Sequence, residues 1–340
     1  MLMNQAEYDK HLKGFEITGC AIRSKDVFYF VAVEEILDRA LPDGDLTTRV
    51  IPHFFQKADN RWSHISYEGY SRTLAGAAQN PGSKFVGVDR GGQVMVVGGG
   101  KMEIEDIPGG RAGPIRGSVN RVKTINGFTH VCSNNRGLAR RDGTDRWTSL
   151  CADLPVKPDP NGFGDAYGFN DFDAFDDGEF YCVGGQSDVW RFDGTSWIQI
   201  DVPGNHSEAS NFLTKAGSKI ARVPLHSVCC AGDGYVYIGG PDGSVWKGRN
   251  EQWKLIHDDR LSLPFKDMVW FQDRVYCTSR YGLWEIVNDE VRHCDVPEEI
   301  SMCSGNLAVA DGVMLLAGEC GAAYHDGLQW RLIFNTSNFS

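Results

Sequence analysis

The feature that most constrains the fold of this chain is an internal repeat built around glycine pairs and tryptophans. In "FYCVGGQSDVWRFDGTSWIQI" (180–200) an apolar run ends at two glycines, and two tryptophans follow, seven positions apart. The same unit returns as "VYIGGPDGSVWKGRNEQWKLI" (236–256). Two less regular copies are "VYCTSRYGLWEIVNDEVRHC" (275–294) and "LLAGECGAAYHDGLQWRLI" (315–333). Such recurrence predicts one repetitive architecture and not several unrelated domains.

Each copy has the length and pattern of one four-stranded blade of a β-propeller. The first aromatic residues of the copies, Trp190, Trp246, Trp284 and Tyr324, lie 56, 38 and 40 residues apart. Apolar runs separated by Asp-Gly turns predict antiparallel hairpins, because these turn residues tolerate positive φ. The two tryptophans of a copy then flank a hairpin, and we expect both rings to pack between neighbouring blades.

Three further copies lie upstream, so the whole chain is predicted to be a single all-β domain, a seven-bladed β-propeller of four-stranded antiparallel blades. The second blade is the least regular, with three strands in residues 84–107. The blades are expected at residues 14–68, 84–114, 115–151, 169–201, 224–257, 266–296 and 304–335. How the ring closes stays open. The C-terminal "NTSNFS" or the N-terminus could supply a latch if the first blade lacks a strand.

The order of diglycine, aromatic residue, six residues and tryptophan resembles the kelch repeat of β-propellers. The resemblance covers residues 170–335 well and the first half of the chain loosely. The chain departs from kelch in the short stretch between the diglycine and the aromatic residue, and two copies lack one Gly or the Trp. The resemblance implies a propeller fold, and a fold by itself dictates no function.

The connections of a propeller alternate between its two faces. Links between blades share one face with the connections from second to third strands, and the remaining turns lie on the other. Long connections are expected at residues 36–60, 69–83, 152–168 and 202–223, all on the first of these faces. Insertions cost little loop entropy and often carry function, so this face is the predicted binding face.

One stretch of that face interleaves carboxylates with aromatic residues, which is typical of an anchor for a basic partner. The predicted partner-binding residues are Asp159, Phe163, Asp165, Tyr167, Asp171, Asp173, Asp176 and Asp177. An alternative interpretation is that "FNDFDAFDDG" (169–178) is an inner strand. Its Phe side chains would then be core, and its Asp side chains would line a solvated channel. The sequence leaves both interpretations open.

The formal net charge of −11 disfavours nucleic acid as a ligand and favours a basic protein partner. The longest basic run is "ARR" (139–141). The start of the chain lacks a signal-peptide pattern, and no apolar run approaches membrane-spanning length, so we expect a soluble cytoplasmic protein. The ten cysteines include no C-x-x-C pair, and we expect them to be buried free thiols.

No catalytic or metal-binding motif is readable. The acidic run from Asp171 to Asp177 fails the calcium-loop pattern, because Phe175 stands where an oxygen ligand belongs. The nine histidines show no H-x-H or H-E-x-x-H spacing, and no G-x-S-x-G elbow or phosphate loop occurs. We therefore predict no enzymatic activity, no cofactor and no metal. A pair of glycosidase carboxylates stays open, because their separation cannot be read from a sequence.

The size, the acidity and the lack of a catalytic constellation resemble bacterial immunity proteins, which neutralise a cognate toxin by covering its active site. The resemblance implies a non-enzymatic protein-binding propeller whose partner is a basic toxin. Two alternatives stay open. One is a hydrolase or lyase acting on glycans, with a polar pocket that holds carboxylates. The other is a scaffold subunit of a larger complex, with apolar patches at its blade edges.

Overall fold

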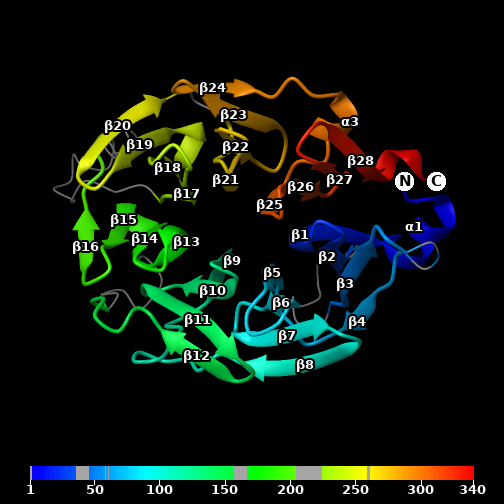
Figure 1. Cartoon of the computed structure of the whole chain (residues 1–340), viewed down its shortest axis with the longest axis horizontal. Helices are drawn as coiled ribbons and strands as arrows, with labels where there is room; N and C mark the ends of the chain where they lie inside the picture. Colours follow the sequence, from blue (N-terminus) through cyan, green and yellow to red (C-terminus); the bar gives the residue numbers. More distant parts are fainter. Residues whose placement is uncertain are drawn as a thin grey trace, which may run out of the picture.

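The chain forms seven four-stranded antiparallel sheets arranged in a ring (Figure 1). The computed structural model describes residues 2–35, 46–57, 59, 61–156, 167–203, 224–258 and 261–340. The fold is the all-β seven-bladed propeller that the repeat predicts.

Every blade is built from four consecutive strands. Blades 1 and 2 contain β1 (Phe15–Ser24), β2 (Val27–Glu34), β3 (Thr48–Phe54), β4 (Ile65–Tyr67), β5 (Leu74–Ala78), β6 (Lys84–Val88), β7 (Gln93–Gly98) and β8 (Lys101–Asp106). Blades 3 and 4 contain β9 (Val119–Ile125), β10 (Phe128–Ser133), β11 (Gly137–Gly143), β12 (Arg146–Ser149), β13 (Phe169–Asp176), β14 (Glu179–Gly184), β15 (Asp188–Phe192) and β16 (Trp197–Ile200). Blades 5 to 7 contain β17 (Ser227–Cys230), β18 (Val236–Gly239), β19 (Val245–Arg249), β20 (Gln252–His257), β21 (Asp267–Phe271), β22 (Arg274–Thr278), β23 (Leu283–Val287), β24 (Glu290–His293), β25 (Asn306–Ala310), β26 (Val313–Gly318), β27 (Gly321–His325) and β28 (Trp330–Asn335). The helices α1 (Gln5–His11) and α3 (Glu298–Ser301) lie outside the sheets, as do the 3₁₀ turns η2 (Gly185–Ser187), η4 (Pro241–Gly243) and η5 (Thr336–Asn338).

The first strand of each blade lies innermost, and the other three follow outward in chain order (Figure 1). The inner strands β1, β5, β9, β13, β17, β21 and β25 contact one another in turn, and β25 contacts β1. The apolar core lies between the blades, because both faces of each sheet pack against a neighbour. In one cluster, for example, Val86 and Val94 of blade 2 pack with Val122 and Val131 of blade 3.

The tryptophans of the repeat bind one blade to the one before it. Trp190 is buried in a cluster with Leu138 of blade 3. The indole N–H of Trp197 donates to the backbone carbonyl of Leu150, 3.0 Å away, at the end of the same preceding blade. The expectation that both rings pack between blades is confirmed for this copy.

Two strands lie in stretches that were expected to be long connections, namely β3 within 36–60 and β5 within 69–83. Pro52 interrupts the strand pattern of β3, and β5 consists mostly of Ala and Gly, which have low β-propensity. Both strands nevertheless pair along their length with a neighbour. The first strand of blade 2 therefore begins at Leu74, upstream of the predicted start of that blade at residue 84.

The two faces of the ring differ in their connections. We call the face that carries the links between blades, and the connections from second to third strands, the loop face. The opposite face, with the turns that join first to second and third to fourth strands, is the turn face. The segments 36–45, 157–166 and 204–223 lie outside the described residues, and the strand ends that bracket them all lie on the loop face.

Several turns on the turn face adopt positive φ at successive residues. Asp311 and Gly312 have φ of 50° and 74°, and Gln272 and Asp273 have φ of 49° and 63°. This conformation suits two-residue hairpin turns, because its twist matches that of the paired strands. The expected use of Asp-Gly as a tight turn is confirmed at Asp311.

The ring closes without exchange of a strand, since blade 1 and blade 7 are each complete. The N-terminal segment joins them instead. The backbone N–H of Met3 donates to the carbonyl of Ile333 on β28 at 3.1 Å, and the ring of Tyr8 stacks on that of Phe339 at 4.3 Å. Both termini thus take part in closure, with α1 lying beside the C-terminus (Figure 1).

We expect Leu12→Ala to lower the free energy of unfolding by about 2–5 kcal/mol, because it opens a cavity in the cluster that joins blades 1 and 7. Urea unfolding followed by tryptophan fluorescence measures this change. Leu2→Ala is the matched control: Leu2 is 56% exposed, and its loss should cost no more than about 0.5 kcal/mol. A loss in the free energy of unfolding for Leu12→Ala that is as small as the loss for Leu2→Ala would show that the N-terminal segment does not contribute to closure.

Candidate functional site

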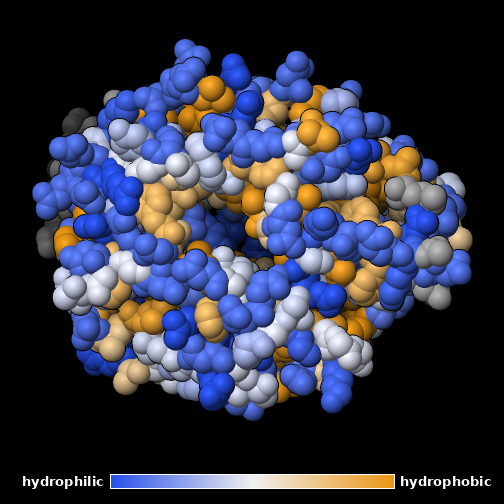
Figure 2. Space-filling view, in the orientation of Figure 1, coloured by the Kyte–Doolittle hydropathy of each residue, from blue (hydrophilic) through white to orange (hydrophobic). Residues whose placement is uncertain are grey.

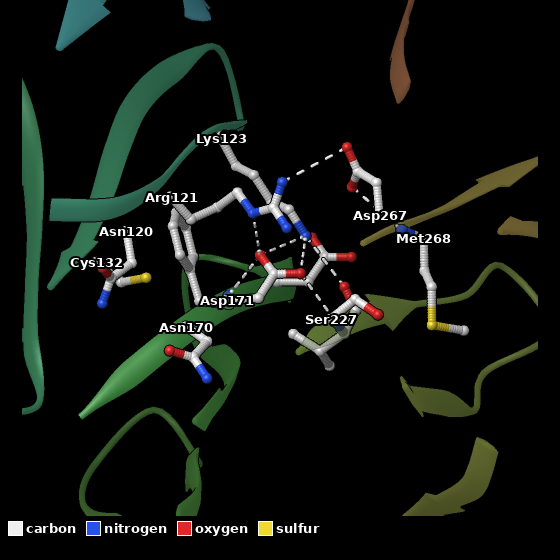
Figure 3. Close-up of polar contacts among 12 residues, drawn as sticks. Asn120, Arg121, Lys123, Cys132, Asn170, Asp171, Ser227, Asp267 and Met268 are labelled. Atoms are coloured by element: carbon white, nitrogen blue, oxygen red, sulfur yellow. Dashed lines mark hydrogen bonds and ion pairs between the residues drawn. The ribbon is translucent and has the colours of Figure 1, made fainter. Parts of the chain in front are cut away.

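Five charged side chains lie close together at the centre of the ring, and we call them the channel cluster. Figure 3 labels Arg121, Lys123, Asp171 and Asp267 among them. They are Arg121 and Lys123 on β9, Asp171 and Asp173 on β13, and Asp267 on β21. Lys123 Nζ lies 3.0 Å from Asp171 Oδ1, and Arg121 Nε lies 3.1 Å from the same oxygen. Arg121 also reaches across the channel, where its Nη1 lies 3.5 Å from Asp267 Oδ2. The cluster therefore links blades 3, 4 and 6.

The aspartates of the channel cluster also bind the backbone of the next blade. Their carboxylates accept hydrogen bonds from the N–H groups of Val228 (to Asp171, 2.9 Å), Cys230 (to Asp173, 2.7 Å) and Leu307 (to Asp267, 3.1 Å). The donor strands β17 and β25 are the innermost strands of their sheets, so no further strand pairs with the edge that faces the channel. The carboxylates satisfy N–H groups that would otherwise be buried without a partner.

Burial and charge act in opposite directions within the channel cluster. Burial disfavours the charged form of Lys123, yet the carboxylates of Asp171 and Asp173 outweigh it and raise the pKa of Lys123 above its usual value. Arg121 behaves in the same way: burial opposes its charge, while Asp171 and Asp267 raise its pKa. For Asp173 burial is the larger influence, and it raises the pKa of this carboxyl despite the nearby Lys123. The basic groups are thus held firmly in their charged form.

The structure places the predicted site residues in several different environments. Asp159, Phe163 and Asp165 lie outside the described residues. Tyr167, on the loop face, has its ring 5.7 Å from the guanidinium of Arg136. That guanidinium is itself buried and makes a two-pronged ion pair with Asp188, at 2.5 and 2.7 Å.

The remaining four predicted residues follow β13 from the interior to the turn face. Asp171 and Asp173 are the two members of the channel cluster on β13. Asp171 is fully buried, and Asp173 lies in the channel wall. Asp176 and Asp177 are exposed at the far end of the strand, on the turn face. Phe172, between Asp171 and Asp173, is fully buried in the core, as the inner-strand interpretation holds. The sequence pattern suggested a single patch. In the structure, these residues of β13 and its turn lie in two places, the channel and the turn face.

The sequence patterns did not reveal the basic half of the channel cluster. Arg121 and Lys123 stand two positions apart on an inner strand, which points both side chains toward the channel. This spacing of two residues on an inner strand is the sequence signal that could have identified Arg121 and Lys123. Asp267 likewise opens an inner strand, and nothing in its neighbourhood distinguishes it from a turn residue.

The channel has a cavity at each end, and its centre is hollowed in the space-filling view (Figure 2). The cavity toward the turn face has a volume of about 560 Å³, and every member of the channel cluster except Asp171 lines its floor. The cavity toward the loop face measures about 330 Å³ and is lined by charged residues. These are Glu16, Arg72, Lys266, Arg280 and Glu319.

The loop-side cavity holds two carboxyl groups, which bears on the glycan-acting alternative. Burial and then a hydrogen bond with the Glu319 carboxyl raise the pKa of Glu16. Glycosidases hold their two carboxyl groups about 5 Å or more apart, with the sugar between them. Arg280 Nε lies 2.6 Å from Glu319 Oε1, so one of the two carboxyl groups is already held in an ion pair.

The described residues contain no group of three or more His, Cys, Asp or Glu side chains arranged to hold a metal ion. All ten cysteines are free thiols. Across the described ranges, none of the helices is both long and apolar enough to cross a membrane.

The chain is 28% identical over 243 residues to the immune protein Tsi7 of Pseudomonas aeruginosa, a stretch that covers 71% of this chain and 73% of that protein. No protein-family model matches. Among solved structures it is similar to the WD40 β-propeller domain of Doa1, with a TM-score of 0.57, 9% identity and 90% of each chain covered. It is also similar to the WD40 repeats of RRP9, with a TM-score of 0.56, 12% identity and coverage of 94% and 91%. These structures show the fold alone, and the kelch resemblance is not confirmed.

We expect Asp171→Ala to cost about 3–5 kcal/mol of stability, because it leaves two buried cations short of a partner and the Val228 N–H unsatisfied. Thermal and urea unfolding measure the loss. Asp177→Ala, at the exposed end of the same hairpin, is the control and should change stability by about 0.5 kcal/mol or less. A loss below about 1 kcal/mol for Asp171→Ala would show that the channel cluster does not hold the inner strands together.

Proposed function

We propose that this protein is a non-enzymatic immunity protein, which acts in the cytoplasm by binding a basic protein toxin and blocking its active site. The observation that carries the proposal is the 28% identity to an immune protein over 71% of the chain. The propeller fold supports it, because a rigid ring presents broad faces on which side chains from several blades converge.

The chemistry of the central channel supports binding over catalysis. The charged groups of the channel cluster bond to one another and to the backbone of neighbouring blades. A catalytic acid or base must instead reach a substrate proton, with a pKa matched to that task. The net charge of −11 suits a basic partner, because opposite charge speeds encounter and disfavours wrong partners.

The predicted partner-binding residues enter this proposal in two groups. Asp176 and Asp177 are exposed on the turn face and remain candidates for direct contact. Tyr167, on the loop face, also remains a candidate, as do Asp159, Phe163 and Asp165, which lie outside the described residues. Asp171 and Asp173 act indirectly, because they hold β13 against β17 and so maintain the shape of the ring.

The proposal is tested by isolating the partner and measuring its toxicity. The tagged protein is purified from its native cells, and the bound protein is then expressed alone in a bacterial host. We expect colony counts to collapse with the partner alone and to recover fully when this chain is co-expressed. The recovery follows because a bound propeller excludes substrate from the active site of the toxin.

Co-expression of an unrelated seven-bladed propeller is the control for a general effect of protein load. A partner that is harmless when expressed alone would overturn the immunity proposal. The same holds for a toxic partner that kills equally with and without this chain.

A further inference from the structure

The turn-side cavity is open to solvent and broad enough to admit a ligand. Its volume of about 560 Å³ falls within the roughly 300–1,000 Å³ typical of binding pockets. Residues at the turn ends of the inner strands line it, including Gln79, Gly127 and Asp311. Its outlet therefore lies at the centre of the turn face, encircled by the turns that join the first two strands of each blade.

The outer part of this cavity is largely apolar. Ile22, Ala77, Val269, Trp270 and Ala310 line it, and Val309 stands at its mouth with 39% of its surface exposed. At the floor, the charges of the channel cluster already satisfy one another and the inner strands. The cavity therefore offers apolar contact along its wall and few uncommitted polar groups to orient a small polar molecule.

The rim of the cavity carries negative charge. The turns between first and second strands comprise residues 25–26, 79–83, 126–127, 177–178, 231–235, 272–273 and 311–312. They contain Asp26, Asp177, Asp233, Asp273 and Asp311 against the single Lys25. Lys247 partly neutralises Asp233, at 3.3 Å. The loop-side cavity has the opposite balance, with three basic and two acidic residues.

We infer that the turn-side cavity is the docking site for an extended basic segment of the partner protein. An apolar side chain of the segment enters the mouth of the channel beside Trp270 and Val309, and flanking Arg or Lys side chains meet the acidic rim. This inference rests on the proposed function and deepens it by naming the surface and the chemistry of the partner. The inference places the partner on the turn face, whereas the long connections in the sequence predicted binding on the loop face.

The test compares matched variants on the two faces. The rim variant combines Asp177→Asn, Asp273→Asn and Asp311→Asn, which remove charge. Asn tolerates the positive φ of Asp273 and Asp311. Its control combines Asp201→Asn, Asp258→Asn and Asp295→Asn, three exposed aspartates that follow fourth strands on the loop face. Val309→Arg is a further variant, which places bulk and positive charge at the mouth. Circular dichroism and the melting temperature establish that each variant folds.

Binding is measured by surface plasmon resonance against the toxic partner isolated above, at two salt concentrations. Fluorescence anisotropy follows a labelled peptide in which arginine alternates with leucine, and a matched peptide with glutamate in place of arginine. We expect the rim variant and Val309→Arg each to weaken binding of the toxin and of the basic peptide by about tenfold, and the rim variant to reduce the salt dependence. The loop-face control should bind as the unmodified protein does, and the glutamate peptide should not bind.

Toxin binding that is lost in the loop-face control and kept in the rim variant would overturn this inference and leave the immunity function intact. If no toxic partner exists, the immunity proposal fails separately, and the peptides still decide the docking site. Equal binding of the two peptides would then overturn the inference. So would binding of free arginine as tight as that of the basic peptide, because it would assign the mouth to a small molecule.

Discussion

The structure depends on the way in which polar side chains join the inner strands of neighbouring blades. Each blade satisfies its own backbone through a four-stranded ladder, and none of these sheets extends into the next. At the centre, where seven strands run side by side in the same direction, N–H groups face a neighbour with which they form no ladder. Asp171, Asp173 and Asp267 accept those hydrogen bonds, and Lys123 and Arg121 compensate the charge that the carboxylates bring into the interior. The ring is thus apolar between its blades and ionic along part of its axis.

This arrangement explains which parts of the fold and of the site could be predicted from the sequence. The glycine pairs and tryptophans recur because each blade needs the same turn and the same contact with its predecessor, and they predicted a seven-bladed ring. β3 and β5 were missed because Pro52 and a run of small residues hide the strand pattern, and pairing with β2 and β6 overrides that local preference. In the site, the alternation of Asp and Phe on β13 was visible. Period-two alternation shows that the aspartates share one side of the strand, but it does not say whether solvent or a lysine lies beyond them.

The ring is closed by side-chain contacts and by the two chain termini. A propeller whose first and last blades are each complete has no shared strand to join them, so the junction relies on side chains and on the chain termini. Met3, Leu12 and Phe334 share one buried cluster, and Asn4 caps α1 through a reciprocal pair of bonds with Glu7. The capped helix α1 at the N-terminus is thereby packed next to the last strand of the chain, some 330 residues away in sequence.

The acidic rim of the turn face exceeds what the turns require. Tight turns with positive φ accept Asn, Gly or Asp, and Asn126 with Gly127 makes such a turn without any charge. An Asn at Asp273 or Asp311 would satisfy the backbone equally well, so turn geometry alone does not account for aspartate there. The carboxylates stand on short turns held by strands on both sides, so their positions are set before any partner arrives and little conformational entropy is lost on binding. Carboxylates beyond what the turn geometry requires, fixed around an apolar opening, are what the proposed basic segment of the partner would meet.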